Sequence, residues 1–324
     1  MENPTYRPAV SIVIPTHSEQ RWPLLVRTVA SAKSQEYPAA EIVVVIDHNP
    51  ELYRRARRDL PGVTVLENLY EQGVSGNRNT GAFHTHTPLI AFLDDDVIAA
   101  TDWLGKLVAP FADPAVVGTG GGISPAWENS RPRWMPDEFL WAVGGSYTGM
   151  PTTTSRIRNV WSASMVVRRE TFMAVGGFRT GFGKKGNQAS PEDTELCLRM
   201  SAHGGGHWMY VPDAVIRHAV PAKAATFGFF LRRCYAEGRG KVQMAGLLDG
   251  SESLGSERDY LRSLPKAVVR NIAAASRGRG VNHALRAGGV LAGVAAAGFG
   301  GAVETVAGRR AERRPAAAPA GATR

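Results

Sequence analysis

The sequence has only two cysteines among its 324 residues, Cys197 and Cys234. Two thiols cannot form a disulfide framework, so the chain is expected to work in a reducing compartment. Long hydrophobic runs are also scarce. The longest, residues 288–303, has 16 residues, six of them glycine, whereas a membrane span needs about 20 apolar residues. We therefore expect this run to pack against helices or to lie at an interface.

The sequence also lacks a secretory signal, and residues 1–261 carry no net charge. The apolar residues 10–14 are too few for the hydrophobic part of a signal, so a cytoplasmic protein is expected. Residues 1–261 carry 27 basic and 27 acidic side chains, and residues 262–324 carry 11 and 2. The balanced body argues against nucleic-acid binding. The basic C-terminal part predicts contact with an anionic membrane surface. The alternative is a disordered basic tail that binds no partner.

Short apolar runs alternate with helical patterns over the first hundred residues. This alternation predicts an α/β fold with a mainly parallel sheet and right-handed crossovers. The expected strands are residues 10–14, 41–46, 63–66, 89–93, 159–169, 207–211 and 214–218. The expected helices are residues 23–33, 53–60, 73–86, 101–111, 225–241 and 255–276. No internal repeat is present.

Acidic residues follow two of the predicted strands. Asp94, Asp95 and Asp96 end the strand of residues 89–93. Asp94 and Asp96 are two apart and face the same way on an extended chain, so they suit Mg²⁺ or Mn²⁺ together with substrate phosphates. The alternative is a capped, solvated turn. Asp47 ends the strand of residues 41–46 and can accept hydrogen bonds from a ribose or base, or can cap the helix after it.

Further candidate residues lie in loops and at helix starts. Residues 73–81 form a glycine-containing helix entry with Arg78 that favours an anion, although Walker and dinucleotide patterns are absent. Residues 176–189 contain five glycines and also Lys184 and Lys185, which predicts a basic lid. Trp161 can stack on a sugar or fill the core. His218 is a candidate metal ligand, with ordinary packing as the alternative.

An ordered set of motifs resembles the family-2 inverting glycosyltransferases of GT-A fold over roughly residues 8–245. The set comprises Val-Ser-Ile-Val-Ile-Pro-Thr at 10–16, the strand ending at Asp47, Gly73 with Arg78-Asn-Thr-Gly81, Phe-Leu-Asp-Asp-Asp at 92–96, Gly-Gly-Phe at 176–178, Glu-Asp-Thr-Glu-Leu-Cys-Leu-Arg at 192–199, and His218. The fold it implies is a Rossmann-like, mixed but mainly parallel sheet flanked by helices, followed here by a basic helical extension.

The resemblance implies a role for each matching residue. Donor-binding residues would be Pro15, Thr16, Glu19, Asp47, Arg78, Asp94 and Asp95. Asp96, Asp94 and His218 would hold Mn²⁺ or Mg²⁺, and Trp161, Lys184 and Lys185 would contact substrate. Asp193 would be the general base, with Glu192 beside it. These last two acids also suit a simple helix start.

The expected activity is the transfer of one sugar from a nucleotide sugar to a hydroxyl of a lipid-linked sugar or cell-surface glycan. The transfer is expected to depend on a metal ion and to invert the anomeric carbon, and the donor is expected to be UDP-linked. No Gln-x-x-Arg-Trp follows Asp193, which favours a single transfer over processive synthesis. The alternatives are a non-catalytic sugar-nucleotide or glycan-binding scaffold at the membrane and a nucleotidyltransferase. The expected domains are a catalytic domain at 1–245, a helical extension at 246–308 that associates with the inner membrane face, and a disordered tail at 309–324.

Overall fold

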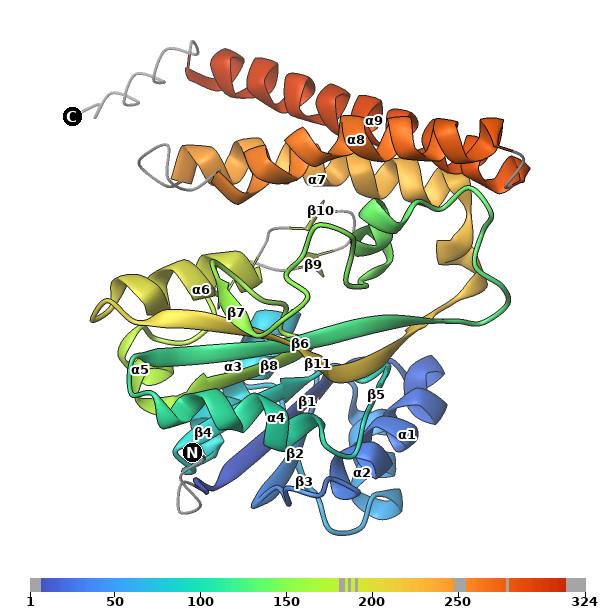
Figure 1. The fold of residues 1–324 in the computed structure, drawn as a ribbon. Helices are drawn as coiled ribbons and strands as arrows, with labels where there is room; N and C mark the ends of the chain where they lie inside the picture. The colour runs from blue at the N-terminus through green and yellow to red at the C-terminus, as the bar shows by residue number, and fades with distance from the viewer. Residues whose placement is uncertain are drawn as a thin grey trace, which may run out of the picture. The chain divides into compact units, whose positions relative to one another are not determined.

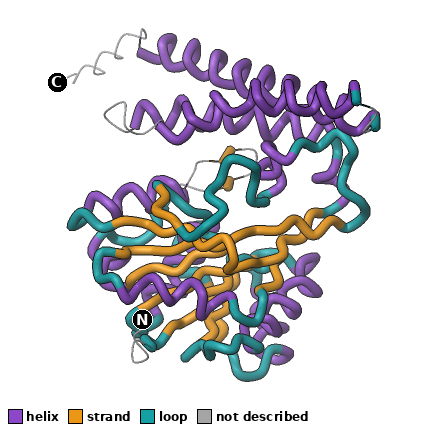
Figure 2. Tube along the Cα trace, viewed as in Figure 1, coloured by secondary structure: helices purple, strands orange, loops and turns teal. Residues whose placement is uncertain are grey.

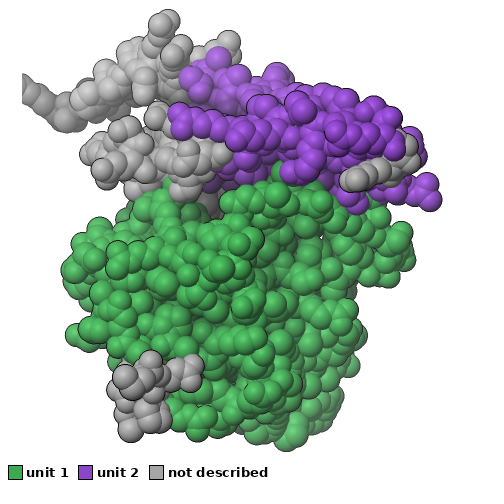
Figure 3. Space-filling model, in the orientation of Figure 1, with its two compact units in different colours: residues 1–132, 137–225 green, residues 133–136, 226–324 purple. Residues whose placement is uncertain are grey.

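The computed structural model describes residues 7–180, 184–185, 188–189, 192–247, 255–277 and 280–312. Contacts divide the chain into two compact units, one of residues 1–132 and 137–225 and one of residues 133–136 and 226–324 (Figure 3). Helix α7 falls in the second unit, whereas the predicted catalytic domain runs to residue 245. Of the predicted tail, residues 309–312 end helix α9 and residues 313–324 lie outside the described part.

The first unit is built on one sheet of nine strands with helices on both faces (Figures 1 and 2). Its main order is β3-β2-β1-β4-β8-β6-β11-β5, and β7 pairs with β11. The strands are β1 (Val10–Thr16), β2 (Glu41–Ile46), β3 (Thr64–Glu67), β4 (Leu89–Leu93), β5 (Val97–Ala99), β6 (Val116–Trp127), β7 (Ser155–Ile157), β8 (Ser164–Arg168) and β11 (His207–Val220). Strands β9 (Lys184–Lys185) and β10 (Gln188–Ala189) pair separately.

Helices of the first unit follow the strands closely. They are α1 (Trp22–Lys33), α2 (Pro50–Asp59), α3 (Val74–His84), α4 (Trp103–Val108), α5 (Arg169–Ala174) and α6 (Glu192–Ala202), with short 3-10 turns η1 (Glu19–Arg21), η2 (Ala109–Ala112), η3 (Asp137–Val143) and η4 (Ala222–Ala225). The second unit contains α7 (Phe227–Leu247), α8 (Gly255–Ser276) and α9 (Val281–Glu312).

The core explains why the first strands read as continuous apolar runs. Strands β3, β2, β1 and β4 are parallel, and β1 sends Ile12 and Ile14 into the core on one face of the sheet and Val13 into the core on the other. Burial on both faces removes the polar alternation that a half-exposed strand would show. The predicted mixed, mainly parallel sheet flanked by helices, with C-terminal helices after it, is confirmed.

The second half of the sheet differs in detail from the sequence prediction. The glycine-rich residues 118–122, for which no strand is predicted, lie within the long strand β6. A side chain at Gly118 would overlap the ring of Trp208, so glycine permits the close packing here. The two predicted strands at 207–211 and 214–218 are one strand, β11, whose register shifts between Val211 and Val215. In that irregular strand, His218 pairs with Val97, the first residue of β5 and the residue directly after the acidic triplet.

Candidate active site

The three acids after β4 have three different environments. Asp95 is the buried middle member. Its Oδ2 accepts a 2.5 Å hydrogen bond from the Thr16 hydroxyl, and its Oδ1 accepts one of 2.6 Å from Arg21. Burial raises the pKa of Asp95 despite the opposing effects of Arg21 and Thr16. Asp95 therefore ties the ends of β1 and β4 to η1, and its role in donor binding stays a prediction.

Asp96 points toward His218. Its Oδ2 lies 3.1 Å from Arg21 Nη1, and its Oδ1 lies 3.4 Å from His218 Nε2. This Oδ1 is buried and has no hydrogen-bond partner among the described residues. Burial acts to raise the pKa of Asp96, but His218 and Arg21 outweigh it and lower the pKa overall.

The other ring nitrogen of His218 fixes the orientation of the imidazole. Nδ1 lies 3.1 Å from the carbonyl oxygen of Val143. A carbonyl only accepts, so Nδ1 carries the hydrogen and the neutral ring presents the Nε2 lone pair toward Asp96. Gly144, with φ of 75°, lies against the ring, where a Cβ would come within 3.0 Å of it. Burial acts to lower the pKa of His218, but Asp96 and Asp94 raise it overall.

An unpartnered carboxylate oxygen facing an imidazole nitrogen is a donor set that suits a divalent cation. The histidine hydrogen bond to a backbone carbonyl is the support that metal-binding histidines usually have. Within the described residues, no group of three His, Cys, Asp or Glu side chains is gathered around one point. Asp96 and His218 thus fit two positions of a cation whose remaining ligands would be substrate and water oxygens.

Asp94 contacts a second set of charged residues. Arg78 is 3% exposed and donates to Asp94 Oδ1 at 2.8 Å and to Glu192 Oε1 at 3.2 Å. Its guanidinium also lies over the Phe178 ring, 5.4 Å from the centroid. Burial acts to lower the pKa of Arg78, but Asp94, Asp193 and Glu192 hold it above its ordinary value. One buried guanidinium therefore joins the triplet to the acids near residue 193.

Glu192 and Asp193 begin helix α6, and both are half-buried. Burial, followed by repulsion from Asp193, raises the pKa of Glu192 to about 7 against the effect of Arg78. Burial also raises the pKa of Asp193, although Arg78 and a hydrogen bond from Ser162 oppose it. Asp193 Oδ1 has no hydrogen-bond partner among the described residues. A carboxylate with a raised pKa and an unused oxygen is suited to accept a proton.

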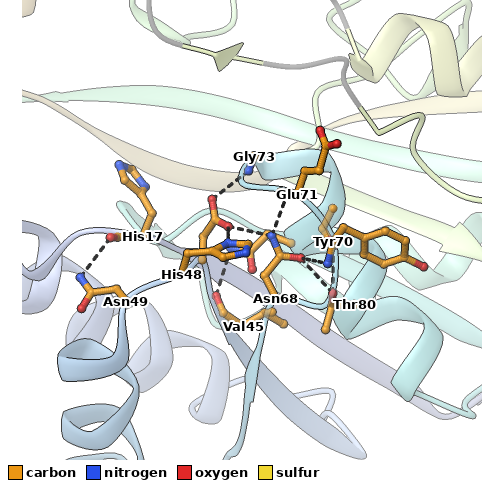
Figure 4. Close-up of polar contacts among 12 residues, drawn as sticks. His17, Val45, His48, Asn49, Asn68, Tyr70, Glu71, Gly73 and Thr80 are labelled. Carbon is orange, nitrogen blue, oxygen red and sulfur yellow. Dashed lines mark hydrogen bonds and ion pairs between the residues drawn. The ribbon is translucent and has the colours of Figure 1, made fainter.

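Asp47 holds together the loops that follow β2 and β3. Its partners Asn68 and Gly73 and the neighbouring His48 are labelled in Figure 4. Its Oδ1 accepts a 2.7 Å hydrogen bond from Asn68, and its Oδ2 accepts one of 3.0 Å from the Gly73 backbone N–H. His48 Nδ1 lies 2.8 Å from the same Oδ1, and His48 has the unusual φ of 52°. The side-chain amide of Asn77 donates to the carbonyls of both β1 and β2. Asp47 is thus rigidly positioned, and its contact with a donor stays a prediction.

The remaining predicted residues lie outside the Asp96–His218 pair and the group of acids around Arg78. Pro15 and Thr16 are buried at the end of β1, and Glu19 is exposed in η1. Trp161 is half-buried, 6.2 Å from the Tyr147 ring, and directly precedes the Ser162 that bonds Asp193. The backbones of Lys184 and Lys185 form β9, and their side chains lie outside the described part of the chain.

Sequence reasoning missed three residues that hold the site. Arg21 bonds Asp95 and contacts Asp96, Ser162 donates to Asp193, and Asn68 donates to Asp47. Arg21 and Ser162 have no distinguishing sequence context. Asn68 follows the third parallel strand, and that position at the sheet edge was the available signal.

The family model "Glycosyl transferase family 2" matches residues 11–176, about half of the chain. The chain belongs to glycosyltransferase family 2. The resemblance found from the motifs is therefore confirmed, and the protein is a glycosyltransferase.

Two curated relatives extend the similarity beyond the matched segment. Glucosyl-dolichyl phosphate glucuronosyltransferase of Haloferax volcanii is 29% identical over 265 residues, covering 80% of this chain and 84% of that protein. Succinoglycan biosynthesis protein ExoM of Rhizobium meliloti is 25% identical over 228 residues, covering 68% and 70%.

Two solved structures establish the GT-A fold. The mannosyltransferase PcManGT of Pyrobaculum calidifontis, in complex with GDP-Man and Mn²⁺, has a TM-score of 0.56 at 19% identity, covering 91% of this chain and 88% of that one. GalNAc-T7 with UDP, GalNAc and Mn²⁺ has a TM-score of 0.52 at 18% identity, covering 80% and 55%. At these identities the likeness concerns the fold, and the fold is the predicted GT-A class.

Proposed function

We propose that this glycosyltransferase moves one sugar, with inversion, from a nucleotide sugar to the hydroxyl of a lipid-linked sugar or glycan. The observation that carries the proposal is the bridge made by Arg78, which bonds Asp94 at 2.8 Å and Glu192 at 3.2 Å. Because one guanidinium bonds both, Asp94 at the end of β4 and Glu192 at the start of α6 lie on opposite sides of a single side chain. A single sugar between donor diphosphate and acceptor needs that proximity.

Asp193 is the proposed base. Its unpartnered Oδ1 takes the proton of the acceptor hydroxyl while the hydroxyl oxygen attacks the anomeric carbon from the side opposite the diphosphate. The bond from the anomeric carbon to the diphosphate oxygen breaks, and the nucleoside diphosphate leaves with the electron pair. General-base assistance of this kind contributes about 10²–10⁴-fold to the rate.

The proposed cation, Mn²⁺ or Mg²⁺, would be held by Asp96 and His218, with Asp94 close by. When bound, it would supply positive charge to the leaving diphosphate. The solved relatives in fold that carry Mn²⁺ support this part of the proposal. Lys184 and Lys185 are proposed to contact the same phosphates, and Trp161 to contact the sugar.

The donor is proposed to be UDP-linked, and the acceptor to be lipid-linked, in line with the dolichyl-phosphate relative. Site residues proposed for the donor are Pro15, Thr16, Glu19, Asp47, Arg78, Asp94 and Asp95. We place the enzyme in the cytoplasm, at the inner face of the membrane, because residues 262–324 carry 11 basic and 2 acidic side chains. The unused oxygen of Asp193 favours transfer over a purely binding role.

A panel of nucleotide sugars tests the proposal. Purified enzyme is given each sugar with Mn²⁺ or Mg²⁺ and an acceptor extract, and diphosphate release is measured with and without chelator. We expect release with one sugar class, abolished by chelator and restored by added metal. Binding of a nucleotide sugar with no acceptor-dependent release under any condition would instead support the scaffold alternative.

A further inference from the structure

Two polar side chains of helix α9, Glu304 and His283, contact the other helices of the second unit. Glu304 of α9 pairs with Arg239 of α7 at 2.7 Å and accepts a 2.8 Å hydrogen bond from Gln243. His283 Nδ1 of α9 lies 3.1 Å from Asn271 Oδ1 of α8. Glu304 and His283 are thus used in contacts with α7 and α8, which lie along α9 (Figure 1).

The opposite side of α9 is apolar and exposed. Its large residues are 39% to 66% exposed, and the helical period places them on one half of the helix: Val281, Leu285, Leu291, Val294, Phe299 and Val306. Exposed alanine and glycine fill the positions between them, at 284, 288, 295, 298 and 302. Among the exposed residues of α9 between 281 and 307, where side chains are described, none is charged. We call this surface the α9 stripe.

Water would favour the reverse arrangement. A surface helix in water buries its apolar side and exposes its charges, whereas α9 pairs Glu304 with α7 and exposes its apolar stripe. A continuous apolar surface of this length marks a site that something covers. The neighbouring helix indicates what covers it.

Helix α8 exposes basic and apolar side chains together. Lys266 and Arg277 are exposed, and so are Leu261, Val269 and Ile272. Residues 260–277 contain no acidic residue. Mixed apolar and basic exposure suits the boundary between acyl chains and anionic headgroups, because each type of side chain finds its partner there.

We propose that the α9 stripe lies in the plane of an anionic lipid bilayer, with the basic side chains of α8 contacting the headgroups. By length and composition Val281–Ala307 is long and apolar enough to cross a membrane. Its inner side argues against crossing. A side chain at Gly300 would overlap the backbone of Tyr235, and one at Gly238 would overlap that of Ala297, so α7 and α9 are in backbone contact. Crossing would carry α7 and the Arg239–Glu304 pair into the hydrocarbon.

The inference rests on the membrane association proposed above and is tested on the full chain with vesicles. Binding is measured by co-sedimentation with phosphatidylcholine vesicles, with and without phosphatidylglycerol. The test variant is Leu291→Asp with Phe299→Asp, both at exposed positions. The matched control is Val26→Asp, which changes an exposed apolar residue of α1 in the first unit.

We expect tight binding to the anionic vesicles, weakened by salt, and at least about tenfold weaker binding by the double variant, because it removes two inserting side chains. Val26→Asp should bind like the wild type. Lys266→Gln with Arg277→Gln should weaken binding by roughly fivefold for each charge. Alkaline carbonate should release the wild type from vesicles, as expected for a protein that does not cross.

Three results would overturn the inference. One is equal vesicle binding by wild type and double variant. Another is wild-type protein that stays on the vesicles in alkaline carbonate, which would show that α9 crosses the bilayer. The third is a wild-type dimer, seen by light scattering, that the double variant dissociates while neither binds vesicles. Diphosphate release without vesicles is measured in parallel. It should be the same for wild type and double variant, so failure of the transfer reaction is distinguished from failure of the docking surface.

Discussion

Replacing Arg78 by methionine should move the pH dependence of sugar transfer. Arg78 bonds Asp94 and Glu192 and lowers the pKa of both Glu192 and Asp193. Methionine keeps much of the side-chain volume and removes the charge. The carboxylates around it then lose the cation that favours their charged forms, so their pKa values rise. A base that is protonated over more of the pH range is active over less of it.

The size of the effect follows from the distances. Two unit charges about 4 Å apart interact by about 4 kcal/mol at an effective dielectric constant near 20, which corresponds to about three pH units. Glu192 already has a pKa of about 7, so without Arg78 it would stay protonated through the neutral range. We expect the acid limb of kcat/KM to move up by at least about one pH unit. Loss of the cation should also cost about 3–5 kcal/mol of stability.

The assay is the pH profile of kcat/KM, with unfolding by urea measured alongside. The matched control is Arg199→Met on the same helix as Glu192. Arg199 bonds both oxygens of Glu195, at 2.7 Å and 2.6 Å, and within the described part of the chain no hydrogen bond or ion pair joins it to Glu192 or Asp193. The control should lose stability and keep the wild-type acid limb. The reasoning is refuted if a folded Arg78→Met enzyme keeps the wild-type limb, or if Arg199→Met shifts it equally.

Four further changes test other parts of the structure. Asp193→Asn should lower transfer by about 10²–10⁴-fold while nucleotide affinity, measured by calorimetry, stays near wild type; transfer at the wild-type rate would exclude Asp193 as the base. His218→Ala should weaken Mn²⁺ binding, followed by electron paramagnetic resonance, by at least about tenfold, and unchanged affinity would remove His218 from the metal site. Glu192 has a folded-state pKa of about 7 against 4.5 in the unfolded chain, so the free energy of unfolding of the wild type should rise by about 3 kcal/mol as the pH falls from 7 to 4.5. Glu192→Gln should lack this rise in urea titrations, and a Glu192→Gln protein that kept it would show that another group causes it. Gly81→Ala would press a Cβ against Val13 on β1 and should cost about 1–3 kcal/mol of stability, whereas a neutral result would mean that α3 can shift away from the sheet.

Much of the first half of the fold was predictable because strands β1, β2 and β4 are buried on both faces. The strand of residues 89–93 and the acids after it were read directly from the run of apolar residues followed by like charges. The second half was harder. Strand β6 contains three successive glycines, at 120–122, and its place in the sheet depends on neighbours such as Trp208 that come much later in the chain.

The candidate site shows the same division. The positions of Asp94, Asp96 and His218 at strand ends predict a metal site, and the family resemblance predicts Asp193 as the base. Their contacts were not predictable: Arg78, which is expected among the donor-binding residues, also bonds two carboxylates. Whether it also contacts a nucleoside remains a prediction. Side-chain direction at a buried charge depends on all nearby charges, and these come from segments about a hundred residues apart.

The bridge through Arg78 also bears on how such enzymes can be recombined. Arg78 lies inside the matched segment of residues 11–176, and Glu192 lies beyond it. A chimera that joins the front half of this chain to the back half of a relative would inherit a buried guanidinium from one parent. Unless the other parent brings an acid to the same place, that cation keeps Asp94 from its own half and loses its partner on α6. Grafting a new acceptor specificity would then succeed only for parents that agree on this one pair of charges.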